Sequence, residues 1–245
     1  MMKAMPGSKG EGMAGVVWRL RKCLAPRWRQ RLKREVLLCR PSLYALDSIR
    51  YEQSLPPDEL SALLARLDTA LDVPGDVIEC GCFLCGTTVQ MARHLQMRKS
   101  DKKIYACDSF EGFDPVEISR EKTLDDASDC QDYTDNDFGY IQRKLKRLRV
   151  ADGVVLVRGF FQDTLESLRG PFCLAFIDCD LHDSMLYAAR AVWPRLAPGG
   201  YCVFDDYDND HFRGATKAID TFIAEQADSI RDHGQLLGKL YFARK

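Results

Sequence analysis

The chain lacks the features that would place it across a membrane or on a nucleic acid. Its 245 residues carry 35 Lys and Arg against 36 Asp and Glu, a net charge of −1, so no global field favours an acidic partner. No apolar run approaches the roughly 18 residues that a membrane-spanning helix needs. The short "AGVVW" at 14–18 is also too short for the apolar part of a signal peptide. We therefore expect a cytoplasmic protein with no nucleic-acid partner.

The ten cysteines lack the pattern of a disulfide scaffold or of a zinc site. The spacing Cys80-x-Cys82-x-x-Cys85 is not followed by a second Cys or His pair at ligand spacing. Five of the ten cysteines lie in or beside apolar strand-like runs, where free cysteine behaves as a small core hydrophobe. These are Cys80, Cys107, Cys173, Cys179 and Cys202. Reduced, structural thiols are the expectation.

Residues 1–40 have a composition unlike the rest of the chain. Residues 1–15 are rich in Gly and Met and are expected to be disordered. Eight Lys or Arg follow between Arg19 and Arg34, with apolar residues at roughly helical spacing that Pro26 interrupts. One interpretation is a solvated charged helix pair. The other is a basic amphipathic segment on an anionic membrane, with Trp18 and Trp28 as interfacial anchors.

From residue 41 the pattern becomes that of an α/β domain, residues 41–245. Helices are predicted over 42–55 and 56–71, within the segment 41–72, and strands and helices then alternate. The strand patterns lie at 75–80, 103–108, 154–159, 173–180, 198–207 and 236–245. Near-continuous apolar strands separated by helices of 10–15 residues are typical of a doubly wound, mostly parallel sheet.

The turns after the first two strands predict a nucleoside site. In such sheets ligands bind beyond the carboxyl ends of the strands. The turn "CGCFLCGTT" contains Gly81 and Gly86, and a glycine lets a ligand pack on the backbone. Asp108 ends the second strand, where it suits a ribose hydroxyl pair, although Asp is also a common helix cap.

Two further residues refine the expected ligand. Phe110 would give an adenine an apolar wall. Glu79, at the end of the first strand, suits a cationic group such as an ammonium or a sulfonium. The turn is not the dinucleotide fingerprint G-x-G-x-x-G. The predicted ligand is therefore a nucleoside that carries a positive charge.

Six motifs occur in the order found in a known family. They are "GDVIECGCFLCGTT", "ACDSFEGF", "GFFQDTL", "FIDCDLHDS", "GGYCVFDDY" and "GATKAIDTF". Residues 42–245 thereby resemble the TylF-type family of macrocin- and novobiocin-type sugar O-methyltransferases, which use S-adenosylmethionine and magnesium. One departure is Cys85-Gly86, where the family commonly has Gly-Gly.

The resemblance implies a fold and a set of donor contacts. The fold is the seven-stranded, Rossmann-like fold of class I methyltransferases, with an N-terminal helical lid. The implied donor-binding residues are Glu79, Gly81, Gly86, Thr87, Asp108, Ser109, Phe110, Gly159, Phe160 and Asp178.

Four aspartates lie at the ends of the fourth and fifth strand patterns: Asp178, Asp180, Asp205 and Asp206. Carboxylates packed together raise one another's pKa values unless a cation compensates. An all-oxygen ligand set suits Mg²⁺. By resemblance, Asp178, Asp205 and Asp206 are the metal ligands and Asp180 is the general base. A purely structural role is the alternative.

Several neighbours of these aspartates have simpler interpretations. Asp183 and Ser184 are expected to cap the following helix, and Asp208 and Asp210 to be loop residues. His182 is a second candidate base, and His211 is expected in a surface loop.

Residues 128–140 form a polar insertion between the second and third strands, where connections are usually short. This segment is predicted to cover the substrate. Tyr133, Phe138 and Tyr140 would stack on the substrate, and the segment that carries Tyr44 and Tyr51 would approach the acceptor as a lid.

The leading hypothesis is a magnesium-dependent O-methyltransferase that acts on a sugar-bearing small molecule or glycan. The alternatives are a catechol-type O-methyltransferase and a non-catalytic nucleoside-binding scaffold. A nucleic-acid methyltransferase is disfavoured, because the globular part is not basic. The sequence is compatible with a homo-oligomer and with peripheral contact with an anionic membrane.

Overall fold

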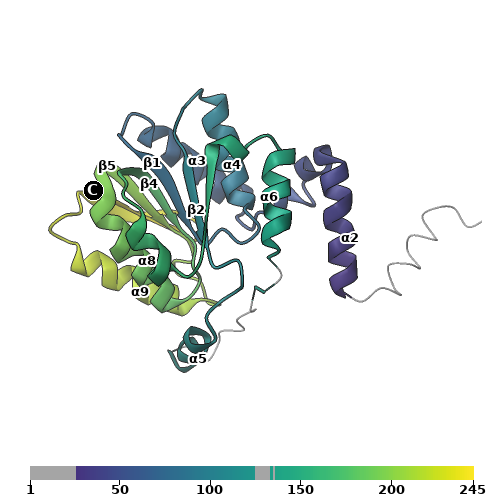
Figure 1. The fold of residues 1–245 in the computed structure, drawn as a ribbon. Helices are drawn as coiled ribbons and strands as arrows, with labels where there is room; N and C mark the ends of the chain where they lie inside the picture. The colour runs from purple at the N-terminus through teal and green to yellow at the C-terminus, as the bar shows by residue number, and fades with distance from the viewer. Residues whose placement is uncertain (1–25, 125–132, 135) are drawn as a thin grey trace, which may run out of the picture. The chain divides into compact units, whose positions relative to one another are not determined.

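The structure, a computed structural model, describes residues 26–124, 133–134 and 136–245 (Figure 1). The chain divides into two compact units, residues 1–43 and residues 44–245. The described part of the first unit contains the helix α2 (Pro26–Cys39). Pro26 is its first residue, where the fixed φ of proline and its missing N–H are tolerated. The part of the predicted basic segment that precedes Pro26, including Trp18, lies outside the described residues.

The second unit is built on one seven-stranded sheet in the order β3-β2-β1-β4-β5-β7-β6. The strands are β1 (Asp76–Cys80), β2 (Ile104–Asp108), β3 (Val154–Arg158), β4 (Phe172–Ile177), β5 (Leu196–Phe204), β6 (Asp232–Leu237) and β7 (Leu240–Arg244). The first five pair in parallel, and β7 runs antiparallel to both of its neighbours. The chain order reverses between β1 and β4, which is where ligands bind in folds of this kind. The doubly wound, mostly parallel fold is confirmed.

Helices cover both faces of this sheet (Figure 1). On one face, α3 (Pro57–Ala70) and α4 (Gly86–Met97) contact each other, and on the other face α8 (His182–Val192) contacts α9 (Arg213–Glu225). Three shorter helices complete the connections: α5 (Pro115–Leu124), α6 (Phe138–Arg147) and α7 (Phe161–Thr164). No helix in the described ranges is both long and apolar enough to span a bilayer.

The central strands are buried almost throughout, which explains their continuous apolar sequence. Every residue of β4 is buried, and only Asp76 of β1 is partly accessible. The strand cysteines belong to this core: among the described cysteines only Cys39 is exposed. Their predicted role as small core side chains is confirmed.

Two predicted elements differ in the structure. The helix expected over 42–55 is instead two short 3₁₀ turns, Pro41–Ala45 and Arg50–Glu52. Arg50, Tyr51 and Glu52 all have positive φ, which an α-helix does not accommodate. The last predicted strand, 236–245, is a hairpin that joins β6 to β7.

The start of α8 is also stabilised differently from the prediction that Asp183 and Ser184 cap it. Its N-cap is Leu181, which makes no side-chain cap hydrogen bond. The amide N–H groups of His182 and Ser184 donate instead to the carboxylates of Glu121 and Glu117 on α5. Two carboxylates from another helix therefore satisfy the free amides and complement the helix dipole.

Candidate active site

A cavity opens at the carboxyl ends of β1, β2 and β4. Most of the residues predicted to bind the methyl donor line it: Glu79, Gly81, Gly86, Thr87, Asp108, Ser109, Phe160 and Asp178. Phe110 and Gly159 are not among the lining residues. Phe110 packs its ring against Phe138, with centroids 4.9 Å apart. We call this space the donor cavity.

Asp108 organises the wall of the donor cavity. One carboxylate oxygen accepts the amide N–H groups of Cys82 and Phe83 at 3.0 and 2.9 Å, and the other accepts the N–H of Phe110 at 2.7 Å. These bonds lower the pKa of Asp108, but burial raises it more, and the net shift is upward. The acid at the end of β2 therefore shapes the first turn in addition to facing the cavity.

Glu79 is a buried carboxyl group with one direct partner among the described side chains, the hydroxyl of Thr88. Burial raises its pKa to about 8, although the hydrogen bond from Thr88 acts in the opposite direction. A cation placed beside this group would reverse the shift by stabilising the carboxylate. This chemistry fits a ligand that carries an ammonium or a sulfonium.

The two glycines of the first turn make room for backbone. A Cβ on Gly81 would lie 1.7 Å from the carbonyl oxygen of Asp178, and one on Gly86 would lie 2.3 Å from the backbone of Gln53. The close approach of backbone explains both glycines, and because both also line the donor cavity, their contact with a ligand stays a prediction. Cys85 has a φ of 55°, the left-handed conformation that favours glycine. The departure from Gly-Gly thus coincides with a residue that adopts a glycine-like conformation.

Residues 52–54 line another wall of the donor cavity, and a buried lysine holds the segment 51–54 that contains them. The Nζ of Lys144 donates to the carbonyl oxygens of Tyr51 and Leu84 at 2.6 and 2.8 Å and lies 3.1 Å from the carboxylate of Glu52. Tyr140 donates its hydroxyl to the same carboxylate at 2.6 Å. Lys144 therefore ties this segment to the first turn.

One buried acceptor on this wall has no partner among the described residues, the Oε1 atom of Gln53. A buried amide oxygen without a donor is costly. The side chain also lines the donor cavity, so a ligand with N–H or O–H groups would satisfy it. Together with Glu79, this supports the fit of a cationic amino-acid group.

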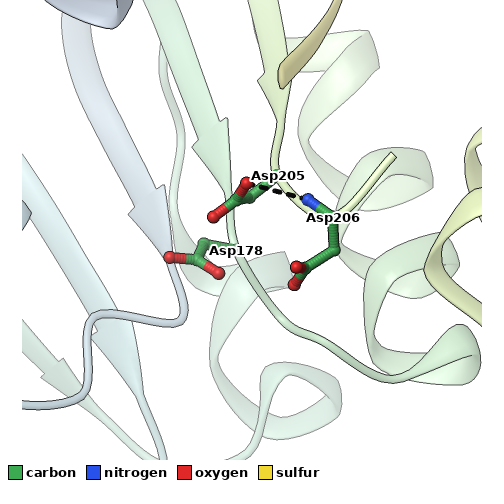
Figure 2. Close-up of side chains that lie close together, drawn as sticks. All are labelled: Asp178, Asp205 and Asp206. Carbon is green, nitrogen blue, oxygen red and sulfur yellow. Dashed lines mark hydrogen bonds between the residues drawn. The ribbon is translucent and has the colours of Figure 1, made fainter. Parts of the chain in front are cut away.

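Three of the four predicted acids converge at the ends of β4 and β5. Ligand oxygens of Asp178, Asp205 and Asp206 all lie within 4.8 Å of one another (Figure 2). The N–H of Asp206 donates to Asp205 at 2.8 Å, and the side chain of Asn209 donates to Asp206 at 2.5 Å. This set is the only such cluster found among the described residues. The donor atoms, all carboxylate oxygens, fit Mg²⁺.

Burial and mutual repulsion perturb this cluster strongly. Burial raises the pKa of Asp178 well above its usual range, and the neighbouring Asp205 raises it further. The pKa of Asp205 rises to about 8 for the same reasons, with Asp206 as its neighbour. A divalent cation would offset both the burial and the repulsion.

Asp180 lies between two cavities. It lines the donor cavity and also a second one, which we call the acceptor cavity; Asp178 and Tyr133 do the same. The acceptor cavity is lined by all four aspartates and by residues such as Glu59, Asn209, His211 and Lys239. Burial raises the pKa of Asp180, and repulsion from Asp206 raises it further. His182 lines neither cavity, and its Nδ1 lies 2.9 Å from Asp183.

The structure separates the aromatic residues that were grouped in the prediction. Tyr133 lies between Phe83 and Phe113, with both ring centroids at 5.2 Å. Tyr140 is fully buried, and its hydroxyl is 2.7 Å from that of Tyr44. The predicted stacking of Tyr140 on a substrate is therefore wrong, because its ring is not accessible, and Tyr44 is equally buried. Residues 128–132 and 135 of the polar insertion lie outside the described residues.

Sequence reasoning missed several cavity residues. Glu117 and Gln53 line the donor cavity, and Asn209 and Lys239 line the acceptor cavity. His211, expected in a surface loop, also lines the acceptor cavity. Their sequence neighbourhoods carry no strand-end pattern, so only the fold brings them to the site. Asp208 and Asp210 line neither cavity, in agreement with a loop role.

Two relatives named as O-methyltransferases match little more than half of the chain. The match to the 4′-O-methyltransferase of 8-demethyl-8-(2,3-dimethoxy-α-L-rhamnosyl)-tetracenomycin C from Streptomyces olivaceus is 29% identical and covers 58% of this chain and 57% of that enzyme. Mycinamicin III 3″-O-methyltransferase from Micromonospora griseorubida is 28% identical over 55% of this chain and 56% of its own length. The chain thus spans little more than half of either enzyme.

The fold is shared with solved methyltransferases. The calicheamicin methyltransferase CalS11 superposes with a TM-score of 0.64 at 19% identity, over 98% of this chain and 99% of that one. Residues 58–232 match the model of a single protein family. This match spans most of the chain and includes the strand ends that border the two cavities. It shows that the protein belongs to the macrocin-O-methyltransferase (TylF) family.

Proposed function

We propose that the protein transfers the methyl group of S-adenosylmethionine to a hydroxyl group of a sugar-bearing acceptor. The observation that carries this proposal is the meeting of the donor and acceptor cavities at Asp178 and Asp180. A donor and an acceptor bound on either side of these two residues would be adjacent. Positioning of the reacting atoms is the main requirement for direct methyl transfer.

The residues of the donor cavity would hold the donor by its separate chemical groups. Glu79 and the Oε1 atom of Gln53 suit the cationic amino-acid end, because one is a buried acid and the other an unsatisfied acceptor. Asp108 suits the ribose hydroxyls, as predicted, and Phe160 and Ser109 line the same cavity. Contacts of Phe110 and Gly159 with the donor stay predictions.

Asp178, Asp205 and Asp206 would hold a divalent cation such as Mg²⁺ through their carboxylate oxygens. When bound there, the ion would lower the pKa of the acceptor hydroxyl and fix its orientation. The backbone of Asp206 and the amide of Asn209 orient two of these carboxylates through hydrogen bonds. Such supporting contacts keep ligands in place.

Asp180 is the residue that we assign as general base. It lines both cavities, so its carboxylate can reach a hydroxyl in the acceptor cavity while that oxygen faces the donor. Its φ of 59° is a strained conformation that surrounding structure must impose. The base would receive the hydroxyl proton as the oxygen bonds to the methyl carbon and the bond from that carbon to the sulfonium sulfur breaks, which leaves a neutral thioether.

A sugar acceptor is favoured by the family and by the named substrates of the relatives. The tetracenomycin enzyme is named for a rhamnosyl compound, and the acceptor cavity here has mixed polar lining, with His211 and Lys239 beside the acids. Such groups can bind hydroxyls from several directions.

Methyl transfer from isotope-labelled donor to a panel of glycosides and catechols tests the proposal. We expect product from glycosides, which chelation of divalent ions abolishes and added Mg²⁺ restores. Product from catechols alone would establish the catechol-type alternative. Donor binding by calorimetry with no turnover on any acceptor would favour the nucleoside-binding scaffold.

A further inference from the structure

The helix α2 carries an exposed apolar stripe that the enzymatic site does not use. Trp28, Leu32 and Val36 are 59%, 57% and 45% exposed. They are spaced four residues apart, so at about 100° per residue they fall within a sector of about 80° on one side of the helix. Leu37 and Leu38, which lie away from this sector, are buried. The helix therefore leaves three large apolar side chains in water.

Basic side chains flank the stripe. Arg29 and Lys33 follow directly after it around the helix, at about 100° and 140° from Trp28, and both are exposed. On the other side, the guanidinium of Arg31 lies 5.6 Å from the centre of the Trp28 ring. Glu35, the one acid in α2, lies about 20° from Trp28 on the side of Arg31. An apolar sector whose borders carry more Lys and Arg than acids is the arrangement of a helix that lies in a membrane interface.

We propose that α2 docks on an anionic membrane surface, with Trp28, Leu32 and Val36 inserted between lipids. The flanking Arg and Lys can extend their charged ends to the headgroups while their carbon chains lie along the apolar sector. Tryptophan favours this interface because its ring is apolar and its N–H is polar. The opposite charge of the lipid surface complements the basic flank.

A second copy of the same helix is a poorer occupant of this face. Pairing two such stripes would bring the basic flanks of both helices together, and like charges at short distance repel. An anionic surface has no such cost.

Vesicle co-sedimentation of the full chain tests the docking. We expect binding to vesicles of phosphatidylcholine with phosphatidylserine, weak binding to phosphatidylcholine alone, and a decline as salt rises. A triple variant, Trp28→Ser, Leu32→Ser and Val36→Ser, should bind at least about tenfold more weakly, because it loses the inserted area. Replacing Arg31 and Lys33 with Gln should cost about fivefold for each charge removed, on the anionic vesicles only.

The matched control is Met97→Ser with Leu237→Ser, which removes two exposed apolar side chains, 73% and 43% exposed, from α4 and β6. This variant should sediment like the unmodified protein. Equal sedimentation of the triple variant and the unmodified protein would overturn the proposal. The proposal would also be overturned if light scattering showed a smaller assembly for the triple variant while its vesicle binding stayed unchanged. That result would assign the stripe to contact between copies of the chain. The readout is vesicle binding, so it is independent of methyl transfer.

Discussion

At the scale of single residues, a substitution of Asp180 tests whether the site is catalytic or only binds ligands. Asp180→Asn keeps the shape of the side chain but removes its ability to accept a proton. We expect turnover to fall by about 10²–10⁴, the usual contribution of a positioned base. Calorimetry should show donor and divalent-ion affinities within a few-fold of those of the unmodified protein. Unchanged turnover would transfer the base role to another group.

Glu79 predicts how donor binding depends on pH. Burial raises its pKa to about 8, so the carboxyl group is mostly protonated at pH 6 to 7. A cationic donor favours the carboxylate, so binding must release this proton, and affinity should rise about tenfold per pH unit up to pH 8. Glu79→Gln should weaken binding and flatten this dependence between pH 6 and 8. Calorimetry in buffers of different ionisation enthalpy would measure the released proton; equal slopes for both proteins would contradict the role of Glu79.

At the scale of elements, Lys144 on α6 holds the segment 51–54 in place. Lys144→Met removes one member of a buried ion pair and leaves the carbonyl oxygens of Tyr51 and Leu84 without this donor. We expect a loss of about 3–5 kcal/mol of unfolding free energy, the range for breaking a buried pair. Denaturant unfolding would measure it.

Lys146→Met is the control for this change, since Lys146 is exposed on the same helix. It should change stability by less than about 0.5 kcal/mol. A second variant, Lys144→Met with Glu52→Gln, removes the unpaired charge and should recover part of the loss. Similar stability of the two single lysine variants would show that the buried pair does not hold the segment.

At the scale of the whole molecule, donor binding should stabilise the fold by mass action. Donor at 100 times its dissociation constant adds about 2.7 kcal/mol. For a chain of this size each kcal/mol raises Tm by about 2–4 °C, so the shift should be about 5–10 °C in a thermal melt. Asp205→Asn should keep this shift, because Asp205 lines only the acceptor cavity. Glu79→Gln should lose most of this rise in Tm at the same donor concentration. A rise in Tm that Glu79→Gln keeps and Asp205→Asn loses would place the donor in the acceptor cavity instead.

The strands of the sheet could be predicted because burial imposes a visible pattern on them. A strand covered on both faces, such as β4, must be apolar at every position. The edge strand β6 alternates between exposed and half-buried residues. Its sequence "DHGQLL" is correspondingly polar, which is why the C-terminal hairpin was predicted as a single strand.

The acids of the site were predictable for a similar reason. Each follows a buried strand, and parallel strands present their carboxyl ends at one edge. The sequence alone thus determined the sheet, the positions of Asp108, Asp178, Asp205 and Asp206 at its strand ends, and the family. These depend on local patterns that the chain carries wherever it folds.

Only the tertiary structure decided what contacts these acids and what closes the site. Gly86 makes room for Gln53, Lys144 joins Tyr51 to Leu84, and Glu117 caps a helix that begins 65 residues later. Each is a contact between segments far apart in the chain, and no short-range pattern encodes it. The conformation of residues 50–52 follows from the same cause: long-range hydrogen bonds and packing outweigh the local preference for a helix.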